Sequence, residues 1–189
     1  MALTGKTAYR LGGDTIADED IDNDANIEIS KLATRTLRFT IPATAFHLEG
    51  TGCVMGGVGD FGYIVMPNAN FSIVYVTIPK PCEYTSDDIT VRILWASAGT
   101  SGNLKLAFTY RGITAGSVDN LGEASTSNTD ATNGSANTLN EMTLTITAAN
   151  IVSSNSIEMW FERDPADGSD TLSSDIKVFA MSLEFTGRG

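Results

Sequence analysis

The feature that most constrains the fold of this sequence is a series of short apolar runs that recur between turn residues from residue 36 onward. In the run 89–95, apolar side chains occupy every second position, and Thr90 and Arg92 lie on the opposite face. An alternation with a period of two is typical of β-strands that bury one face. The clearest strands are therefore predicted at residues 36–41, 61–66, 71–78, 89–96, 104–113, 139–147, 157–163 and 176–185.

Turn residues separate these runs. Proline or glycine interrupts the chain at 79–81, 98–103 and 164–168, where a strand has to end. The separation of Trp95 from Leu104 predicts a hairpin with a longer loop. Such a series of strands with no long helical pattern predicts an all-β fold, an antiparallel two-sheet β-sandwich, with the jelly roll as the most economical arrangement.

Two segments fall outside this pattern. Residues 1–35 are acidic and sparsely apolar, which is not the composition of a segment that forms a core. We expect them to form an extended N-terminal arm ahead of a sandwich domain at 36–189. Residues 114–138 are almost entirely Ser, Thr, Asn, Ala, Gly and acidic residues. This second segment is predicted to be a Greek-key crossover loop that runs over the surface.

The charge of the chain argues against one large class of function. The 189 residues include 23 acids and 12 bases, whereas nonspecific binding to nucleic acid depends on clustered Lys and Arg. Nucleic acid is therefore not an expected partner. No apolar stretch approaches the roughly 20 residues of a membrane-spanning helix, and residues 1–20 lack the basic start and apolar block of an export signal. We expect a protein that is made in the cytosol and contacts no membrane.

Neither the glycine-rich segment nor the cysteines indicate a cofactor. The glycines in 57–62 match the pattern GxGxxG, but a strand that ends at Pro67 follows, in place of the helix that would hold a phosphate. A glycine-rich bend between strands is the better interpretation. Cys53 and Cys82 form no CxxC motif, and nothing implies export, so two reduced thiols are expected rather than a disulfide.

Two acidic segments resemble metal sites without meeting the requirements. The alternating aspartates of 18–24 are spaced like early calcium ligands, yet the sixth and twelfth positions hold Asn23 and Ile29 instead of Gly and Glu. The second segment is a turn around Gly168, where Asp, Pro and Gly are also the residues that an ordinary tight turn selects. We interpret it as an ordinary turn rather than a weak divalent-ion site formed by Asp164, Asp167 and Asp170. No metal is predicted.

Catalytic groups are few. His47 is the single histidine, and no GxSxG motif occurs, so we interpret it as a structural or surface residue. A pair of carboxylates for sugar cleavage stays open, because that geometry is spatial, but none of the 23 acids is marked as a member of a pair. A non-enzymatic protein is therefore predicted, with no catalytic residues.

Aromatic residues in the predicted strands alternate as core residues do. A platform on which carbohydrate stacks is the alternative role for some of them. Trp160 and Phe161 are adjacent, so they cannot both face the core. One of the two is expected to cover an edge or lie in an interface, and Trp160 is the interface candidate.

The N-terminal segment 14–33 resembles a short segment common in head-fibre and tail-fibre proteins of tailed bacteriophages. Asn26 and Glu28 stand where that segment usually has alanines. Farther along, the chain looks like jelly-roll domains of phage virion proteins at 88–95, 102–106, 110–111, 162–164, 170–171 and 176–185. The N-terminal resemblance rests on Ile16, Asp18, Asp20, Ile21, Ala25, Ile27, Ser30, Lys31, Leu32 and Ala33.

This resemblance implies a virion structural protein, foremost a capsid decoration or cement protein that binds the major capsid protein as a homotrimer on the capsid surface. The arm would attach to a neighbouring subunit, with 25–33 as a short helix and with apolar contacts from Ile16, Ile21, Ile27 and Leu32. Two alternatives stay open: a head- or tail-fibre module that binds host-surface glycan, and a carbohydrate-binding β-sandwich module.

Overall fold

The computed structural model describes residues 9–11, 14–16, 34–58, 61–116 and 123–188, within two compact units, Met1–Ala33 and Thr34–Gly189. In the first unit, β1 (Tyr9–Leu11) pairs with β2 (Asp14–Ile16) as an antiparallel hairpin. No helix among the described residues is long and apolar enough to cross a membrane. The second unit contains β3 (Thr34–Pro42), η3 (Ala43–Ala45), β4 (His47–Gly50), β5 (Val54–Val58), β6 (Phe61–Met66), β7 (Ser72–Pro79), β8 (Ile89–Ser97), β9 (Asn103–Ile113), β10 (Ala124–Ala131), β11 (Asn140–Ile146), η4 (Ala148–Asn150), β12 (Ser156–Arg163) and β13 (Ile176–Arg188).

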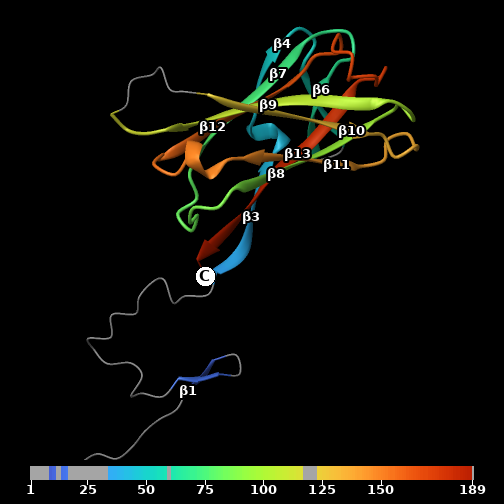
Figure 1. The fold of residues 1–189 in the computed structure, drawn as a ribbon. Helices are drawn as coiled ribbons and strands as arrows, with labels where there is room; N and C mark the ends of the chain where they lie inside the picture. The colour runs from blue at the N-terminus through green and yellow to red at the C-terminus, as the bar shows by residue number, and fades with distance from the viewer. Residues whose placement is uncertain (1–8, 12–13, 17–33, 59–60, 117–122, 189) are drawn as a thin grey trace, which may run out of the picture. The chain divides into compact units, whose positions relative to one another are not determined.

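Two antiparallel sheets pack face to face in the second unit (Figure 1). The five-stranded sheet has the order β10-β9-β12-β7-β4, and the six-stranded sheet has the order β11-β8-β13-β6-β5, with β3 also paired to β13. The β5–β6 and β9–β10 pairs are hairpins within one sheet. The other connections from β3 to β13 pass from one sheet to the other, as in a jelly roll. The predicted all-β, two-sheet antiparallel sandwich is confirmed.

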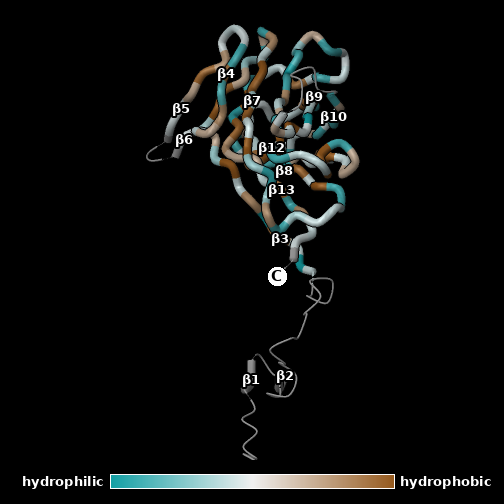
Figure 2. The backbone as a smooth tube through the Cα atoms, turned by 90° about the vertical axis from the view of Figure 1, so that its left-hand side faces the viewer, coloured by the Kyte–Doolittle hydropathy of each residue, from teal (hydrophilic) through white to brown (hydrophobic). Residues whose placement is uncertain are grey.

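The core lies between the sheets because the strands alternate as the sequence predicted. On β12 every second residue is buried, and β7, β8 and β9 follow similar patterns. Figure 2 shows apolar positions alternating with polar ones along such strands. Phe161 is fully buried, whereas its neighbour Trp160 is only partly buried, which confirms that the two do not face the core together. The other buried aromatic residues of the predicted strands are Trp95, Phe108, Tyr110 and Phe185.

The predicted hairpin between Trp95 and Leu104 is wrong. β8 belongs to the six-stranded sheet and β9 to the five-stranded sheet, so the segment between them is a crossover. Alternation shows that a strand buries one face, but both sheets bury a face against the same core. The pattern therefore does not say which sheet a strand joins.

The prediction of a continuous loop at 114–138 is wrong as well, because β10 lies within it and pairs with β9 along its whole length. β10 is the edge strand of the five-stranded sheet, and its residues are largely exposed or only partly buried. An edge strand with one face in solvent needs few apolar residues. Its composition of Ser, Thr and Asn was therefore mistaken for that of a loop.

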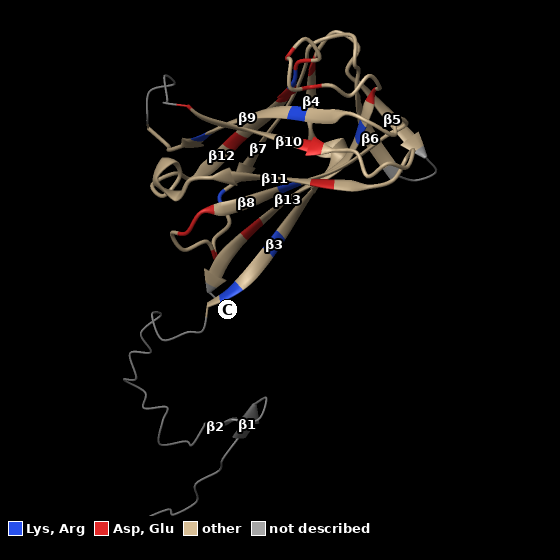
Figure 3. Ribbon diagram, turned by 45° about the vertical axis from the view of Figure 1, so that its right-hand side comes forward, with Lys and Arg blue, Asp and Glu red and all other residues tan. Residues whose placement is uncertain are grey.

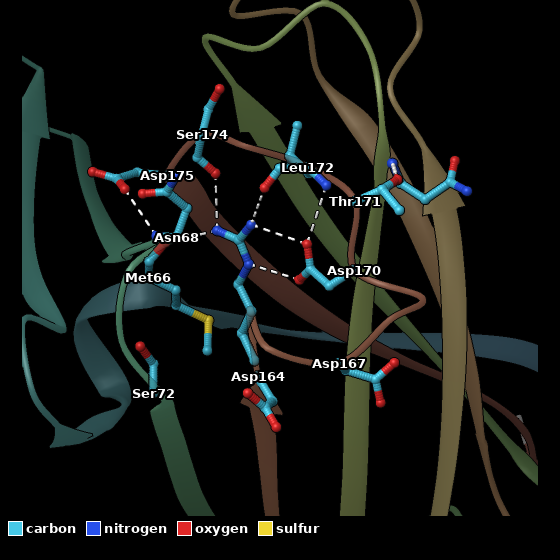
Figure 4. A network of polar contacts seen from close by, with 12 residues as sticks. Met66, Asn68, Ser72, Asp164, Asp167, Asp170, Thr171, Leu172, Ser174 and Asp175 are labelled. Atoms are coloured by element: carbon cyan, nitrogen blue, oxygen red, sulfur yellow. Dashed lines mark hydrogen bonds and ion pairs between the residues drawn. The ribbon is translucent and has the colours of Figure 1, made fainter.

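A buried cation joins the two sheets. Arg163, the last residue of β12, donates from Nε and Nη2 to the carboxylate of Asp170 at 2.9 and 3.2 Å, and neither side chain is exposed. Its other N–H groups donate to the backbone carbonyls of Met66, Leu172 and Ser174 at 3.2, 2.8 and 2.9 Å (Figure 4). Met66 ends β6, whereas Leu172 and Ser174 lie in the loop before β13. One guanidinium therefore links β12 of the five-stranded sheet to β6 of the six-stranded sheet and to the loop that leads into β13.

The loop between β12 and β13 is also fixed from β9. The backbone N–H groups of Thr171 and Leu172 donate to the carbonyl of Asn103 at 2.9 and 3.0 Å, and the Asn103 N–H donates to the Thr171 hydroxyl at 2.9 Å. Gly102 permits this approach, because its φ is +100° and a Cβ there would lie 2.5 Å from the Thr171 carbonyl oxygen. The loop is thus held from two strands of the five-stranded sheet, β12 and β9.

Both cysteines are free thiols, as predicted. Burial raises the pKa of Cys53 to about 11, while Cys82 is exposed, and a hydrogen bond with Glu83 raises its pKa.

The first prediction concerns the buried ion pair. Arg163→Met leaves the Asp170 carboxylate buried without its partner, so we expect it to lower the free energy of unfolding by about 3–5 kcal/mol. The measurement is chemical denaturation followed by circular dichroism. Arg38→Ala, which removes an arginine that is 51% exposed, is the control and should leave the midpoint nearly unchanged. A similar midpoint for both variants would contradict the role of Arg163, and adding Asp170→Leu to Arg163→Met should recover part of the loss.

The second prediction concerns thiol reactivity. Only the thiolate reacts, so a raised pKa means a slower reaction at neutral pH. In the Cys82→Ser variant, Cys53 should react slowly with a disulfide reagent at neutral pH, and the rate should rise about tenfold per pH unit until the pH approaches the pKa. The Cys53→Ser variant, which keeps the exposed thiol, is the comparison and should react faster. Equal rates at neutral pH would contradict this assignment.

Candidate functional site

The strand alternation leaves one outward face on each sheet, and the two faces differ. On the six-stranded sheet, Arg38 and Arg92 contact Glu184 at 2.7 and 3.2 Å, and Arg92 contacts Glu141 at 2.6 Å. The hydrogen bonds from Arg38 and Arg92 hold the pKa of Glu184 below its usual range. Figure 3 shows basic and acidic positions, in blue and red, on neighbouring strands of this sheet. These four charged side chains are therefore paired with one another.

The outward face of the five-stranded sheet carries a row of aromatic side chains. The register places His47, Tyr75 and Trp160 side by side on β4, β7 and β12, and continues the row to Thr109 and Ser125 on β9 and β10. The rings of His47 and Tyr75 stack, with centroids 5.1 Å apart and planes at 18°. Outward positions of a sheet are usually polar, so neighbouring aromatic groups there indicate a binding surface.

A depression of about 260 Å³ opens beside this row. It has an aromatic side formed by Tyr75 and Trp160 and a polar side formed by Glu49, Arg111 and Glu158, and Ile73 also lines it. Arg111 is held by carboxylates, since its Nε donates to Glu158 and its Nη1 lies 3.5 Å from Glu123. The site thus presents ring faces together with fixed hydrogen-bonding groups.

A second depression, of about 190 Å³, lies on the same face. Phe71, Ala107, Glu162 and Asp164 line it together with an ion pair between Lys105 and Asp167, whose Nζ and Oδ2 are 2.6 Å apart. The hydrogen bond from Lys105 holds the pKa of Asp167 below its usual range. The indole N–H of Trp160, in the first depression, donates to Glu162, in the second, at 3.1 Å. The two depressions are therefore neighbours.

The structure places three features that the sequence singled out: the glycine-rich segment, the single histidine and the acidic turn. The glycine-rich segment 57–62 joins the hairpin strands β5 and β6, which confirms the bend. His47 is exposed on β4, in agreement with a surface residue. Within the described residues, no group of three or more His, Cys, Asp or Glu is arranged to hold a metal ion. The three aspartates of the acidic turn are separated in function, because Asp170 binds Arg163 while Asp164 and Asp167 face the second depression.

The structure places only part of the predicted interface. Ile21, Ile27, Leu32 and the calcium-like segment 18–24 lie outside the described residues. Ile16 is the last residue of β2. Trp160 lies on the outward face of the five-stranded sheet, in the aromatic row with Tyr75 and His47.

Sequence reasoning did not find the partners of Trp160. Tyr75 lies between Val74 and Val76, which are both buried, so its position in the alternation already indicated an outward aromatic side chain. Glu49 and His47 come from β4, which at four residues is too short to show an alternation. Only the pairing between strands reveals that these residues meet.

No protein-family model matches this sequence, and no curated protein matches it. Its fold does resemble solved structures. An exo-β-1,3-galactanase from Phanerochaete chrysosporium superposes with a TM-score of 0.51 and 10% identity over 78% of this chain, although the match spans only 29% of the galactanase. A family 35 carbohydrate binding module from Clostridium thermocellum superposes with a TM-score of 0.51 and 11% identity over 78% of this chain and 97% of the module. These likenesses show a shared β-sandwich fold.

Proposed function

We propose that this protein is a non-catalytic carbohydrate-binding domain that takes a glycan on the outward face of its five-stranded sheet. The observation that carries the proposal is the neighbouring pair Tyr75 and Trp160, which lies on an outward face and lines a depression that also holds Glu49, Arg111 and Glu158. Sugar rings present apolar C–H faces that pack on aromatic rings, and their hydroxyl groups exchange hydrogen bonds with fixed polar groups.

The fold shared with a carbohydrate binding module supports the proposal as an analogy, and the residues of the face supply the argument. The other outward face differs, because two of its arginines, Arg38 and Arg92, are bonded to its glutamates. Tyr63 and Phe179 also lie on that sheet, with ring centroids 5.7 Å apart, but they line neither of the two depressions, and Lys177 lies over the Tyr63 ring. The five-stranded sheet is therefore the expected binding face.

The third prediction tests this assignment by substitution. Trp160→Ala should weaken binding to a recognised glycan by about tenfold or more, because it removes the stacking surface. A glycan array identifies the ligand, and isothermal titration calorimetry measures affinity. Tyr63→Ala is the matched control, since Tyr63 is a partly exposed tyrosine on β6 of the other sheet, and it should leave affinity unchanged.

Two results would contradict the proposal. One is the absence of any glycan signal on the array, and the other is equal affinity of the Trp160→Ala variant and the unaltered protein. Release of sugar from a bound oligosaccharide would contradict the non-catalytic part of the proposal.

We infer a second role from the N-terminal segment, namely attachment of the domain to a phage virion. The resemblance of residues 14–33 to fibre proteins supports it, and so does the compact unit Thr34–Gly189, which has its own core. Under this proposal the arm binds the major capsid protein, the domain forms a homotrimer on the capsid surface after synthesis in the host cytoplasm, and the sandwich faces outward to glycan.

The fourth prediction separates this role from glycan binding. The full chain should sediment with capsids and scatter light as a trimer, whereas residues 34–189 should stay in the supernatant and still bind glycan. The arm supplies the capsid contact in this proposal, so its removal should not affect the sandwich. Unchanged sedimentation of the shortened chain with capsids would contradict the role of the arm.

A further inference from the structure

We infer that the ligand of this face is an uncharged linear glycan that runs along β9 and β12 and fills both depressions at once. The inference rests on the proposed glycan-binding function and names the class, the direction and the length of the ligand. It depends on three observations: the residues of the two depressions follow one another along β9 and β12, the side chains between them on β9 are small, and the carboxylates that line the depressions outnumber the bases.

The order of the depressions sets the direction. β9 contributes Arg111 to the first depression and Lys105 to the second, and β12 contributes Glu158 to the first and Glu162 to the second. From Arg111 to Lys105 the strand covers about 20 Å at its usual rise. A single sugar would occupy one depression, whereas a short linear chain spans this distance.

The floor between the two ends is made of small side chains. On β9 the outward residues between Arg111 and Lys105 are Ala107 and Thr109, and the register sets Ser127 and Ser125 beside them on β10. Trp160, opposite Thr109 on β12, rises along one side. A chain can therefore lie on the floor with a ring face against the indole and its hydroxyl groups toward the serines and threonine.

The charge of the two depressions disfavours an acidic ligand. Five carboxylates and two bases line them, and each base is already bonded to a carboxylate, Arg111 to Glu158 and Lys105 to Asp167. A uronate or sulfate group would therefore meet the carboxylates of Glu49, Glu162 and Asp164 without a cation to balance them. A sugar without charge avoids this repulsion.

The experiment compares neutral β-linked gluco-, galacto- and xylo-oligosaccharides of two to six units with oligogalacturonides of equal length, by calorimetry on the full chain. Affinity for a neutral series should rise with length and level off near four units. The oligogalacturonides should bind at least about tenfold more weakly, and high salt should reduce that difference.

Glu162→Gln with Asp164→Asn should improve binding of the oligogalacturonides. Full affinity for a disaccharide, or binding of oligogalacturonides as tight as that of neutral chains, would overturn the inference while leaving the glycan-binding function intact.

A second measurement tests the charge without any glycan. The chain has two tryptophans, and Trp95 is fully buried. A collisional quencher should therefore act mainly on the fluorescence of Trp160, which is partly exposed. Relative to a neutral tryptophan derivative, caesium should quench Trp160 more than iodide does, and Glu162→Gln with Asp164→Asn should reduce the preference. Stronger quenching by iodide would overturn the electrostatic part of the inference even if neutral glycans bind. If no glycan binds while caesium is preferred, the proposed function fails and the acidic character of the face stands.

Discussion

The interaction on which this sandwich depends is the buried bond between Arg163 and Asp170. Burying a charge is unfavourable by several kcal/mol per ion unless its hydrogen-bonding groups find partners. The guanidinium meets this condition, because its N–H groups donate to one carboxylate and three backbone carbonyls. Two of those carbonyls, of Leu172 and Ser174, belong to the segment just before β13, which the guanidinium therefore holds in place. β13 pairs with β8, β6 and β3, so this contact anchors the segment that leads into a strand with three partners.

Much of the fold was predictable because strand alternation is a local property. The buried positions of β7, β8, β9 and β12 follow directly from the sequence. What a local pattern cannot supply is the sheet to which a strand belongs, since both sheets face one core. The crossover between Trp95 and Leu104 was therefore predicted as a hairpin. β10 was not predicted for another physical reason. An edge strand with a solvated face forms through backbone pairing and needs few apolar side chains.

The candidate site was less predictable than the fold, because it is assembled across strands. Trp160 could be singled out, since its neighbour Phe161 takes the core position. Its partners come from three other strands, and Tyr75, Glu49 and Arg111 are far apart in the sequence. Only register brings them together, and register depends on turns and pairings that the sequence pattern leaves open. The one local signal was the outward position of Tyr75 in the alternation of its strand, and by itself this position did not locate the site.

The acidic turn after β12 shows how the core contact also shapes the binding face. Asp170 points inward to Arg163, while Asp164 and Asp167 line the second depression. One carboxylate and three carbonyls form the kind of oxygen-rich set that a hard cation takes, and here the chain supplies its own cation. Arg163 directly follows Glu162 on β12, and Glu162 lines the second depression. The guanidinium therefore holds the turn at a fixed place beside that depression. The interaction that joins the sheets therefore also sets the geometry of the second depression.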